Sequence, residues 1–445
     1  MFKTFIDFFK NRDIRKKIFF TLFILFIFRL GAAIPAPGIN DTIIKLGSNS
    51  LLTMMSILGG GSIEQMSIFS LGVGPYITSS IIIELLAMDI IPPLAEMAKS
   101  GKKGRQQMDR ITRYLAVVLS LVQGYFIVQL LSTTYGIVDN PGFVTYAYIS
   151  IIFTAGTMFL LWLADQITTK GVGNGVSIII FAGIVAGMPS NFQEVYYTFI
   201  GAGATSSLGW IGFIIYILMF VAIIILVVVM QMSERRIPIQ SSTAQRTNRT
   251  KGDLNHLPLK INSASVIPVI FAGALIQGPQ IIASWVNTDA YNWLAKICDF
   301  KSPLFLAFYG LLIILFTFFY TNLQIDPSKI AEDLGKQGNY IPGVRPGSET
   351  KDYISKVLNR ITVLGALLLT FIALLPYVIS NLTGLSQSAA VGGTGIIIVV
   401  GVAMETYKQL KGQLTSKQYK GFVGRKKYYE SSNYWCSRRW QGHNV

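Results

Sequence analysis

The residues that most often carry out enzymatic chemistry are scarce in this chain. Its 445 residues include two histidines, His256 and His443, and two cysteines, Cys298 and Cys436. Two histidines in polar segments cannot supply a plausible Ser-His-Asp triad or a metal cluster, and two cysteines cannot build a disulfide framework. No GxxxxGK[ST] loop is present, so we expect no ATP binding of the Walker A kind. The sequence predicts no catalytic residue, metal or cofactor.

Ionisable side chains inside apolar segments would suit an ion-coupled transporter. The candidates are Arg29, Glu84, Asp89 and Asp165. Asp89 and Asp165 fall near expected helix ends, where snorkelling or capping explains them, and Arg29 suits a structural anchor between helices. Glu84 is the one carboxylate that could serve a proton or sodium relay. A secondary transporter that uses Glu84 therefore stays open as an alternative.

Aliphatic residues flank the glycine- and proline-rich breaks in the apolar segments. They are Val73, Ile77, Ile81, Val176, Ile180, Ile267, Ile270, Ile396 and Ile398. Ordinary helix packing accounts for any one of them. A ring of such side chains would instead form a hydrophobic constriction that stops water and ions.

The elements that must position these residues are membrane spans. The chain is 51% hydrophobic and 13% charged, with a mean hydropathy of +0.50. Because about 20 apolar residues cross a bilayer as a helix, we predict an all-α polytopic membrane protein. Its ten helices are expected at about 16–36, 65–90, 112–132, 146–166, 174–188, 209–231, 265–285, 303–321, 358–379 and 392–408. The first is a retained span rather than a cleaved signal peptide, since many spans follow it.

The basic residues predict the orientation. Of the 38 Lys and Arg residues, 34 fall in the termini and in the loops on their side, and Arg29 lies within the first span. Only Lys45, Lys296 and Lys301 fall on the other side. The positive-inside rule then puts both termini in the cytoplasm.

Two cytoplasmic segments, 233–262 and 322–359, are longer than a connection requires and are rich in Arg, Lys, Gly and Pro. Long loops are more often functional than accidental, and basic ones suit an acidic or RNA-bearing partner. We predict that they dock a partner.

The two halves of the chain carry a pseudo-repeat. If the spans divide five and five, the second span of each half has a proline near its start, in LGVGPYITSSIII (71–83) and SASVIPVIFAGAL (263–275). Two halves with an odd number of spans run in opposite orientations. Paired interruptions of this kind indicate a functional midplane in inverted repeats.

Five longer motifs resemble the SecY/Sec61-alpha family of protein-translocation channels. They are FRLGAAIPAPGIN (28–40), IFSLGVGPYITSSIIIELL (68–86), WLADQITTKGVGNGVSIIIFAGIVAGMP (162–189), HLPLKINSASVIPVIFA (256–272) and NYIPGVRPGSET (339–350). The resemblance covers about residues 14–410. It implies two inverted five-helix halves, 1–190 and 191–410, around a central pore, followed by a cytoplasmic tail at 411–445.

The resemblance also implies how the pore closes. A short plug helix is expected around 58–70, including Gly59, Gly60, Gly61, Ser62, Ile63, Glu64, Gln65, Met66 and Ser67, with a membrane helix from about Gly74. The pore ring would be Val73, Ile77, Val176, Ile180, Ile270 and Ile398, which leaves Ile81, Ile267 and Ile396 to packing. A lateral gate toward lipid would lie between the second and third spans of one half and the seventh and eighth of the other, with helix breaks at Pro75 and Pro268.

The implied function is a passive channel in the bacterial cytoplasmic membrane for unfolded secretory and membrane-protein chains. The expected partners are the small subunits SecE and SecG, the motor SecA, which would hydrolyse the ATP, and the ribosome. Docking would use Arg345, with Arg235, Arg236, Arg246 and Arg249. Residues 241–254 and 426–445 depart from the family pattern, so a specialised paralogue stays open and the tail is assigned no function.

Overall fold

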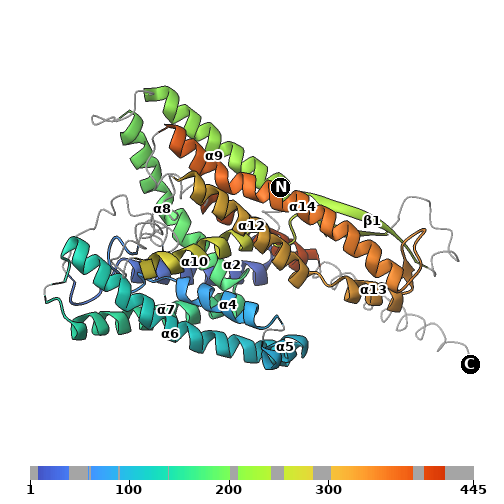
Figure 1. The fold of residues 1–445 in the computed structure, drawn as a ribbon, viewed down its shortest axis with the longest axis horizontal. Coiled ribbons are helices and arrows are strands. Elements are labelled where there is room, and N and C mark those ends of the chain that lie inside the picture. Colours follow the sequence, from blue (N-terminus) through green and yellow to red (C-terminus); the bar gives the residue numbers. More distant parts are fainter. Residues whose placement is uncertain are drawn as a thin grey trace, which may run out of the picture.

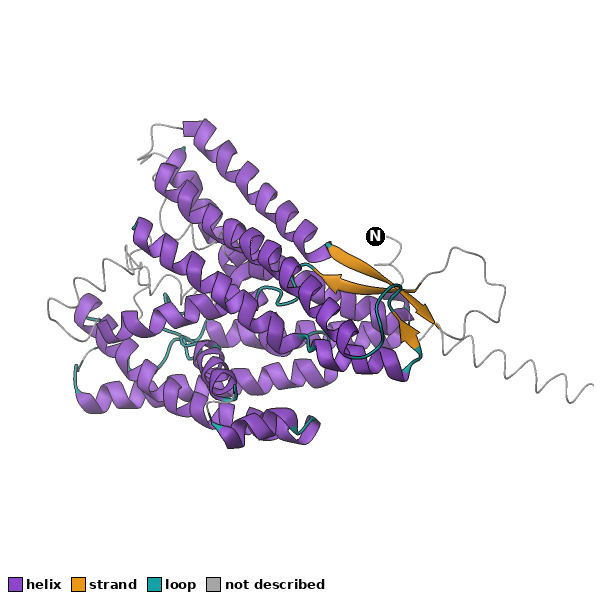
Figure 2. Cartoon of the chain, turned by 45° about the vertical axis from the view of Figure 1, so that its right-hand side comes forward, coloured by secondary structure: helices purple, strands orange, loops and turns teal. Residues whose placement is uncertain are grey.

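The computed structural model describes residues 9–39, 59, 62–88, 91–138, 140–200, 209–241, 255–283, 302–383 and 395–415. This part of the chain is an elongated bundle of helices with a small β-structure at one end (Figures 1 and 2). By length and composition, six of the described helices are apolar enough to cross a membrane.

Every predicted span overlaps a described helix. In chain order these are α2 (Arg12–Ala32), α4 (Gly74–Leu86), α6 (Lys102–Tyr135), α7 (Phe143–Lys170), α8 (Gly175–Phe199), α9 (Gly209–Met232), α10 (Ile267–Ala283), α12 (Pro303–Gln324), α14 (Ser348–Thr383) and residues 395–415. The short helix α5 (Pro92–Lys99) precedes α6.

Each half packs mainly within itself. In the first half α6 contacts α4 and α7, and α7 contacts α2 and α8; in the second half α12 contacts α10 and α14. The halves meet where α4 contacts α10 and where α8 contacts α9. The fold is therefore two five-helix halves with seams between them.

The two prolines of the pseudo-repeat lie at helix starts and do not kink a helix. Pro75 is the second residue of α4 and Pro268 the second of α10. A proline in the first turn loses no helical hydrogen bond, since its missing N–H would have had no partner there. Three residues before each proline the backbone is left-handed, at Gly72 (φ 55°) and Ser265 (φ 56°). The two halves thus enter their second helix through the same turn.

The second span differs from its prediction. The predicted helix at 65–90 begins only at Gly74, and residues 62–73 form consecutive turns. The plug helix expected around 58–70 is therefore not helical in its described part beyond Gly59; Leu58, Gly60 and Gly61 lie outside the described residues. Other helices are longer than predicted, notably α6 and α14, which extend beyond the expected membrane boundaries.

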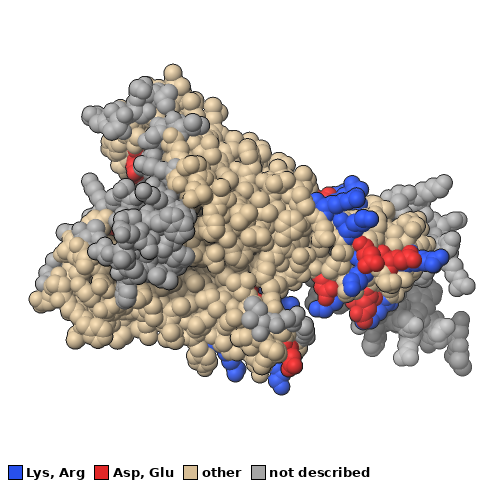
Figure 3. Space-filling model, viewed as in Figure 1, with Lys and Arg blue, Asp and Glu red and all other residues tan. Residues whose placement is uncertain are grey.

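The two long segments predicted to dock a partner fold together at one end of the molecule. β1 (Glu234–Ser241) pairs antiparallel with β2 (Asn255–Lys260) and with β3 (Asn339–Tyr340), in the order β2-β1-β3. The amphipathic helix α13 (Pro327–Lys336) and the start of α14 complete a small apolar core. Charged side chains on the visible face gather at this end and around α5, whereas the middle of the bundle is uncharged (Figure 3).

Candidate functional site

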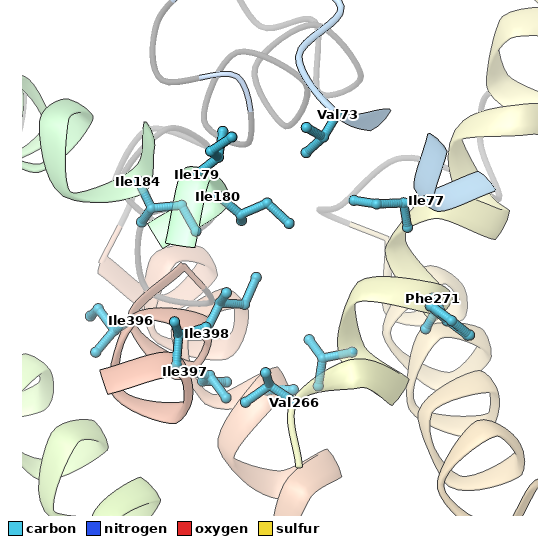
Figure 4. Close-up of a cluster of buried hydrophobic side chains, with 14 of the residues drawn as sticks. Val73, Ile77, Ile179, Ile180, Ile184, Val266, Phe271, Ile396, Ile397 and Ile398 are labelled. Atoms are coloured by element: carbon cyan, nitrogen blue, oxygen red, sulfur yellow. The ribbon is translucent and has the colours of Figure 1, made fainter. Parts of the chain in front are cut away.

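A single hydrophobic cluster contains the residues predicted to close a pore. Val73, Ile77, Ile180 and Ile398 are buried members of the cluster, and Val176 and Ile270 are half-buried and pack against it. Figure 4 shows Val73, Ile77, Ile180 and Ile398 approaching one another from different elements of both halves. All six side chains are aliphatic, so none of them offers a hydrogen bond to water.

The ring residues share a place in their helices. Ile77, Val176, Ile180 and Ile270 lie in the first two turns of α4, α8 and α10, Val73 caps α4, and Ile398 lies in the first described turn of 395–415. The start of α8 is fixed locally, because Asn174 Oδ1 accepts from the backbone N–H groups of Val176 (3.1 Å) and Ser177 (3.4 Å). Asn174 is therefore the N-cap of α8.

The 62–73 segment, which continues directly into α4, is buried and hydrogen-bonded within itself. Ser62 Oγ lies 2.8 Å from the Gly59 carbonyl oxygen and 3.1 Å from that of Phe69, and Ser70 Oγ lies 3.0 Å from that of Ser62 and 2.6 Å from that of Ser67, so each hydroxyl can donate to either carbonyl of its pair. Because the hydroxyls satisfy local carbonyls, a non-helical backbone can lie inside the protein. Glu64 and Gln65 are exposed, whereas their neighbours Ile63 and Met66 are buried.

Two glycines make room for this segment. A Cβ on Gly156 of α7 would overlap the carbonyl oxygen of Ile68, and a Cβ on Gly31 of α2 would overlap the ring of Phe69. The Phe69 ring also stacks between Phe28 and Phe159, at centroid distances of 6.2 and 6.1 Å. The segment is thus held in a socket between α2 and α7.

Glu84 lies at the seam between the halves. Ser80 Oγ donates to its Oε1 at 3.4 Å, its Oε2 is buried without a hydrogen-bond partner, and Tyr320 of α12 is a polar neighbour of the carboxyl group. Tyr320 also meets Phe271 of α10 edge-on at 5.3 Å. A polar contact therefore joins α4 to α12 in a seam that is otherwise largely apolar.

The other predicted ionisable residues have different surroundings. Asp165 of α7 forms a bidentate ion pair with Arg113 of α6, at 2.7 and 3.0 Å, which sequence reasoning missed. Asp89 lies outside the described residues, and Arg29 is in the last turn of α2. Among the described residues, no three His, Cys, Asp or Glu side chains gather as a metal site requires.

The predicted docking arginines that are described lie at the charged end. Arg345 precedes α14 and is 88% exposed in its side chain, with Glu349 at 4.0 Å. Arg235 and Arg236 are exposed on β1, and Arg236 pairs with Glu234 at 2.9 Å. Arg246 and Arg249 lie outside the described residues.

Known structures share this arrangement. A structure described as that of a protein-conducting channel covers 89% of this chain and 91% of its own, with a TM-score of 0.62 and 19% identity. Sec61 in a canine ribosome-channel complex gives a TM-score of 0.60 at 18% identity, with coverage of 89% and 91%. At these identities the match shows the fold: ten spans in two inverted halves around a central pore.

Sequence comparison is more specific. The SecY family model matches residues 67–407. The chain is 44% identical over 435 residues to the protein translocase subunit SecY of Bacillus licheniformis, covering 95% of this chain and all of the relative. Against the same subunit of Bacillus subtilis it is 43% identical over 437 residues, with the same coverage. The helix order, the buried aliphatic cluster and these matches together establish that the chain belongs to the SecY family.

Proposed function

We propose that this chain is the channel subunit through which unfolded polypeptides cross the membrane or leave it sideways into lipid. The observation that carries the proposal is the aliphatic cluster formed by the starts of helices from both halves. Apolar side chains can seal around many different sequences, because they require no specific hydrogen bonds. A sufficiently apolar segment would leave between α4 and α10/α12, since lipid is its better solvent.

In this proposal the 62–73 segment is the plug and is displaced when a polypeptide enters. A related SecY structure, at 19% identity and a TM-score of 0.61, is described as one in which the plug domain stabilises the closed state and maintains a membrane seal. The socket at Gly31 and Gly156 supports the same role here.

The proposal includes partners and orientation. The charge bias supports both termini in the bacterial cytoplasm, so the β1–β2–β3 end faces the cytoplasm and would receive the motor SecA or the ribosome. ATP hydrolysis belongs to SecA, and SecE and SecG would cover part of the lipid-facing surface.

Genetic replacement tests the whole function. Expression of this chain should restore growth and export in cells depleted of their own general channel subunit. Co-purification should recover SecE-like and SecA partners. Rescue of a narrow set of exported proteins alone would indicate a specialised paralogue, and no rescue despite normal membrane levels would contradict the proposal.

Glu84 gives a prediction that separates the channel from the transporter alternative. Glu84→Gln keeps the size and hydrogen-bonding capacity of the side chain at the α4–α12 seam, so polypeptide translocation should stay within about twofold of the wild type. Glu84→Leu removes the polar contact to Tyr320 and should alter the hydrophobicity that a segment needs for lateral release. Release of segments with graded leucine content measures this. Proton-linked solute uptake that Glu84→Gln abolishes would favour the transporter instead.

Arg345 should matter for partner-driven transport and not for sealing. Its exposed guanidinium can bind carboxylate or phosphate bidentately, which lysine does less well. Arg345→Lys and Arg345→Ala should lower SecA-driven translocation into vesicles by about tenfold or more, while resting ion conductance stays unchanged.

Lys336→Ala is the matched control for Arg345. Lys336 is exposed on α13 at the same end, and its hydrogen bond to Glu332 raises the pKa of the lysine. Equal losses in both variants would indicate a general charge effect and not a docking role for Arg345.

A further inference from the structure

A polar pocket lies beside the aliphatic ring. It has a volume of about 320 Å³ and is formed by the end of α7, the start of α8 and the helix 395–415. Its lining residues are Thr168, Gly173, Asn174, Ser177, Val402, Glu405, Thr406 and Gln409. Val402 also belongs to the same hydrophobic cluster as Ile180 and Ile398, so the pocket adjoins the ring.

The backbone N–H donors at the start of α8 are used by the protein itself. The N–H of Gly175 donates to Thr168 Oγ at 2.8 Å, and those of Val176 and Ser177 donate to Asn174 Oδ1. The first amides of α8, which would otherwise attract an anion, therefore already have acceptors. None of these three amides is free to bind an anionic ligand.

Acceptors and negative charge are available instead. Glu405 is the one ionisable side chain among the eight lining residues, and it is exposed. Two nearby lysines point to other groups: Lys408 Nζ donates to the Gln231 carbonyl at 2.9 Å, and Lys17 Nζ approaches Gln413 Oε1 at 3.5 Å. Neither ammonium group neutralises Glu405 directly, so the pocket suits a cationic donor.

We propose that this pocket receives a lysine or arginine side chain of the polypeptide that enters the channel. The inference rests on the proposed function, which brings such chains past the ring. The carboxylate of Glu405 would pair with the cation, and the side-chain oxygens of Ser177, Thr406 and Gln409 would accept its remaining hydrogens. A basic residue held here stays on the cytoplasmic side while the apolar residues after it enter the ring.

The test uses two forms of one secretory precursor, with either lysines or glutamines before its apolar segment. The wild-type channel should translocate the lysine form about two- to fivefold better, as expected for a partly exposed ion pair. In Glu405→Gln this ratio should fall to about one. In Glu405→Lys a precursor with aspartates in place of the lysines should become the better substrate. Glu332→Gln, an exposed carboxylate on α13 at the same end, should leave the ratio unchanged.

A cross-link provides a second, independent measurement. In a chain with Cys298 and Cys436 replaced by serine, Glu405→Cys should form a disulfide with a precursor that carries cysteine in place of one lysine, stalled in the channel. A lysine-to-glutamine ratio that is the same in wild type and Glu405→Gln, with no cross-link, would overturn the inference. If the wild type translocated neither precursor, the proposed function itself would fail.

Discussion

Replacing Ile77 and Ile180 together by serine should raise the resting ion conductance of the closed channel by about tenfold or more. Both side chains are buried in the cluster that joins the two halves, at 9% and 3% exposure. A serine hydroxyl can hydrogen-bond to water and is smaller than the isoleucine side chain, so the constriction becomes both wider and easier to wet. Single-channel recording in planar bilayers measures the effect.

The helix 395–415 offers a matched pair for this prediction. Ile398 and Ile396 are both buried, but we assign Ile398 to the ring and Ile396 to packing; Figure 4 shows them in different directions from their helix. The Ile398→Ser variant should therefore show a raised resting ion conductance, whereas Ile396→Ser should destabilise the protein without a comparable rise in conductance. Unchanged conductance in the Ile77/Ile180 variant, or equal leakage from Ile396→Ser, would contradict the ring assignment.

The second large effect is expected from Gly156→Ala. The added methyl group would overlap the carbonyl oxygen of Ile68, which is backbone and cannot rotate away. Overpacking of this kind costs about 1–3 kcal/mol, and here displacement of the 62–73 segment relieves it. Ser67, which is fully buried, should become accessible, and ion leakage should rise.

Accessibility can be measured at one site. In a chain without its native cysteines, Ser67→Cys should react with a membrane-impermeant maleimide several-fold faster when Gly156→Ala is also present. Gly187→Ala is the control, since Gly187 also lies inside a helix but has no atom within 4 Å of an added Cβ. Equal labelling rates in the two alanine variants would show that the socket does not hold the segment.

Hydropathy was sufficient to place the spans, because a membrane helix needs a long apolar run and few other elements have one. The same pattern could not give the backbone of 62–73, where the hydroxyls of Ser62 and Ser70 bond to nearby carbonyls and Ser67 Oγ accepts from the Phe69 N–H in place of a continuous helix. The predicted helix at 65–90 was wrong in its first nine residues for this reason.

Contacts between helices that are far apart in the sequence could not be predicted either. The sequence identified Glu84 as an unusual carboxylate. Its neighbour Tyr320 lies in the other half of the chain, and no spacing in the sequence predicts that the two side chains meet. The ion pair between Arg113 and Asp165 was missed for the same reason. The ring residues themselves came from a family resemblance; aliphatic residues are too common in membrane helices for periodicity to select six of them.

The internal hydrogen bonds of the 62–73 segment bear on how fast the channel can open. The hydroxyls of Ser62 and Ser70 bond within the segment, and two backbone hydrogen bonds, from Ala36 N–H to the Met66 carbonyl and from Ile68 N–H to the Ile34 carbonyl, join it to the turn after α2. In the proposed plug role, the two bonds to the turn after α2 would break while the internal bonds persist, so that the segment would leave its socket as one preformed body that turns near Gly72. Its return then requires no refolding of the segment, so we expect the reseating time of a lid motion, on the order of microseconds to seconds.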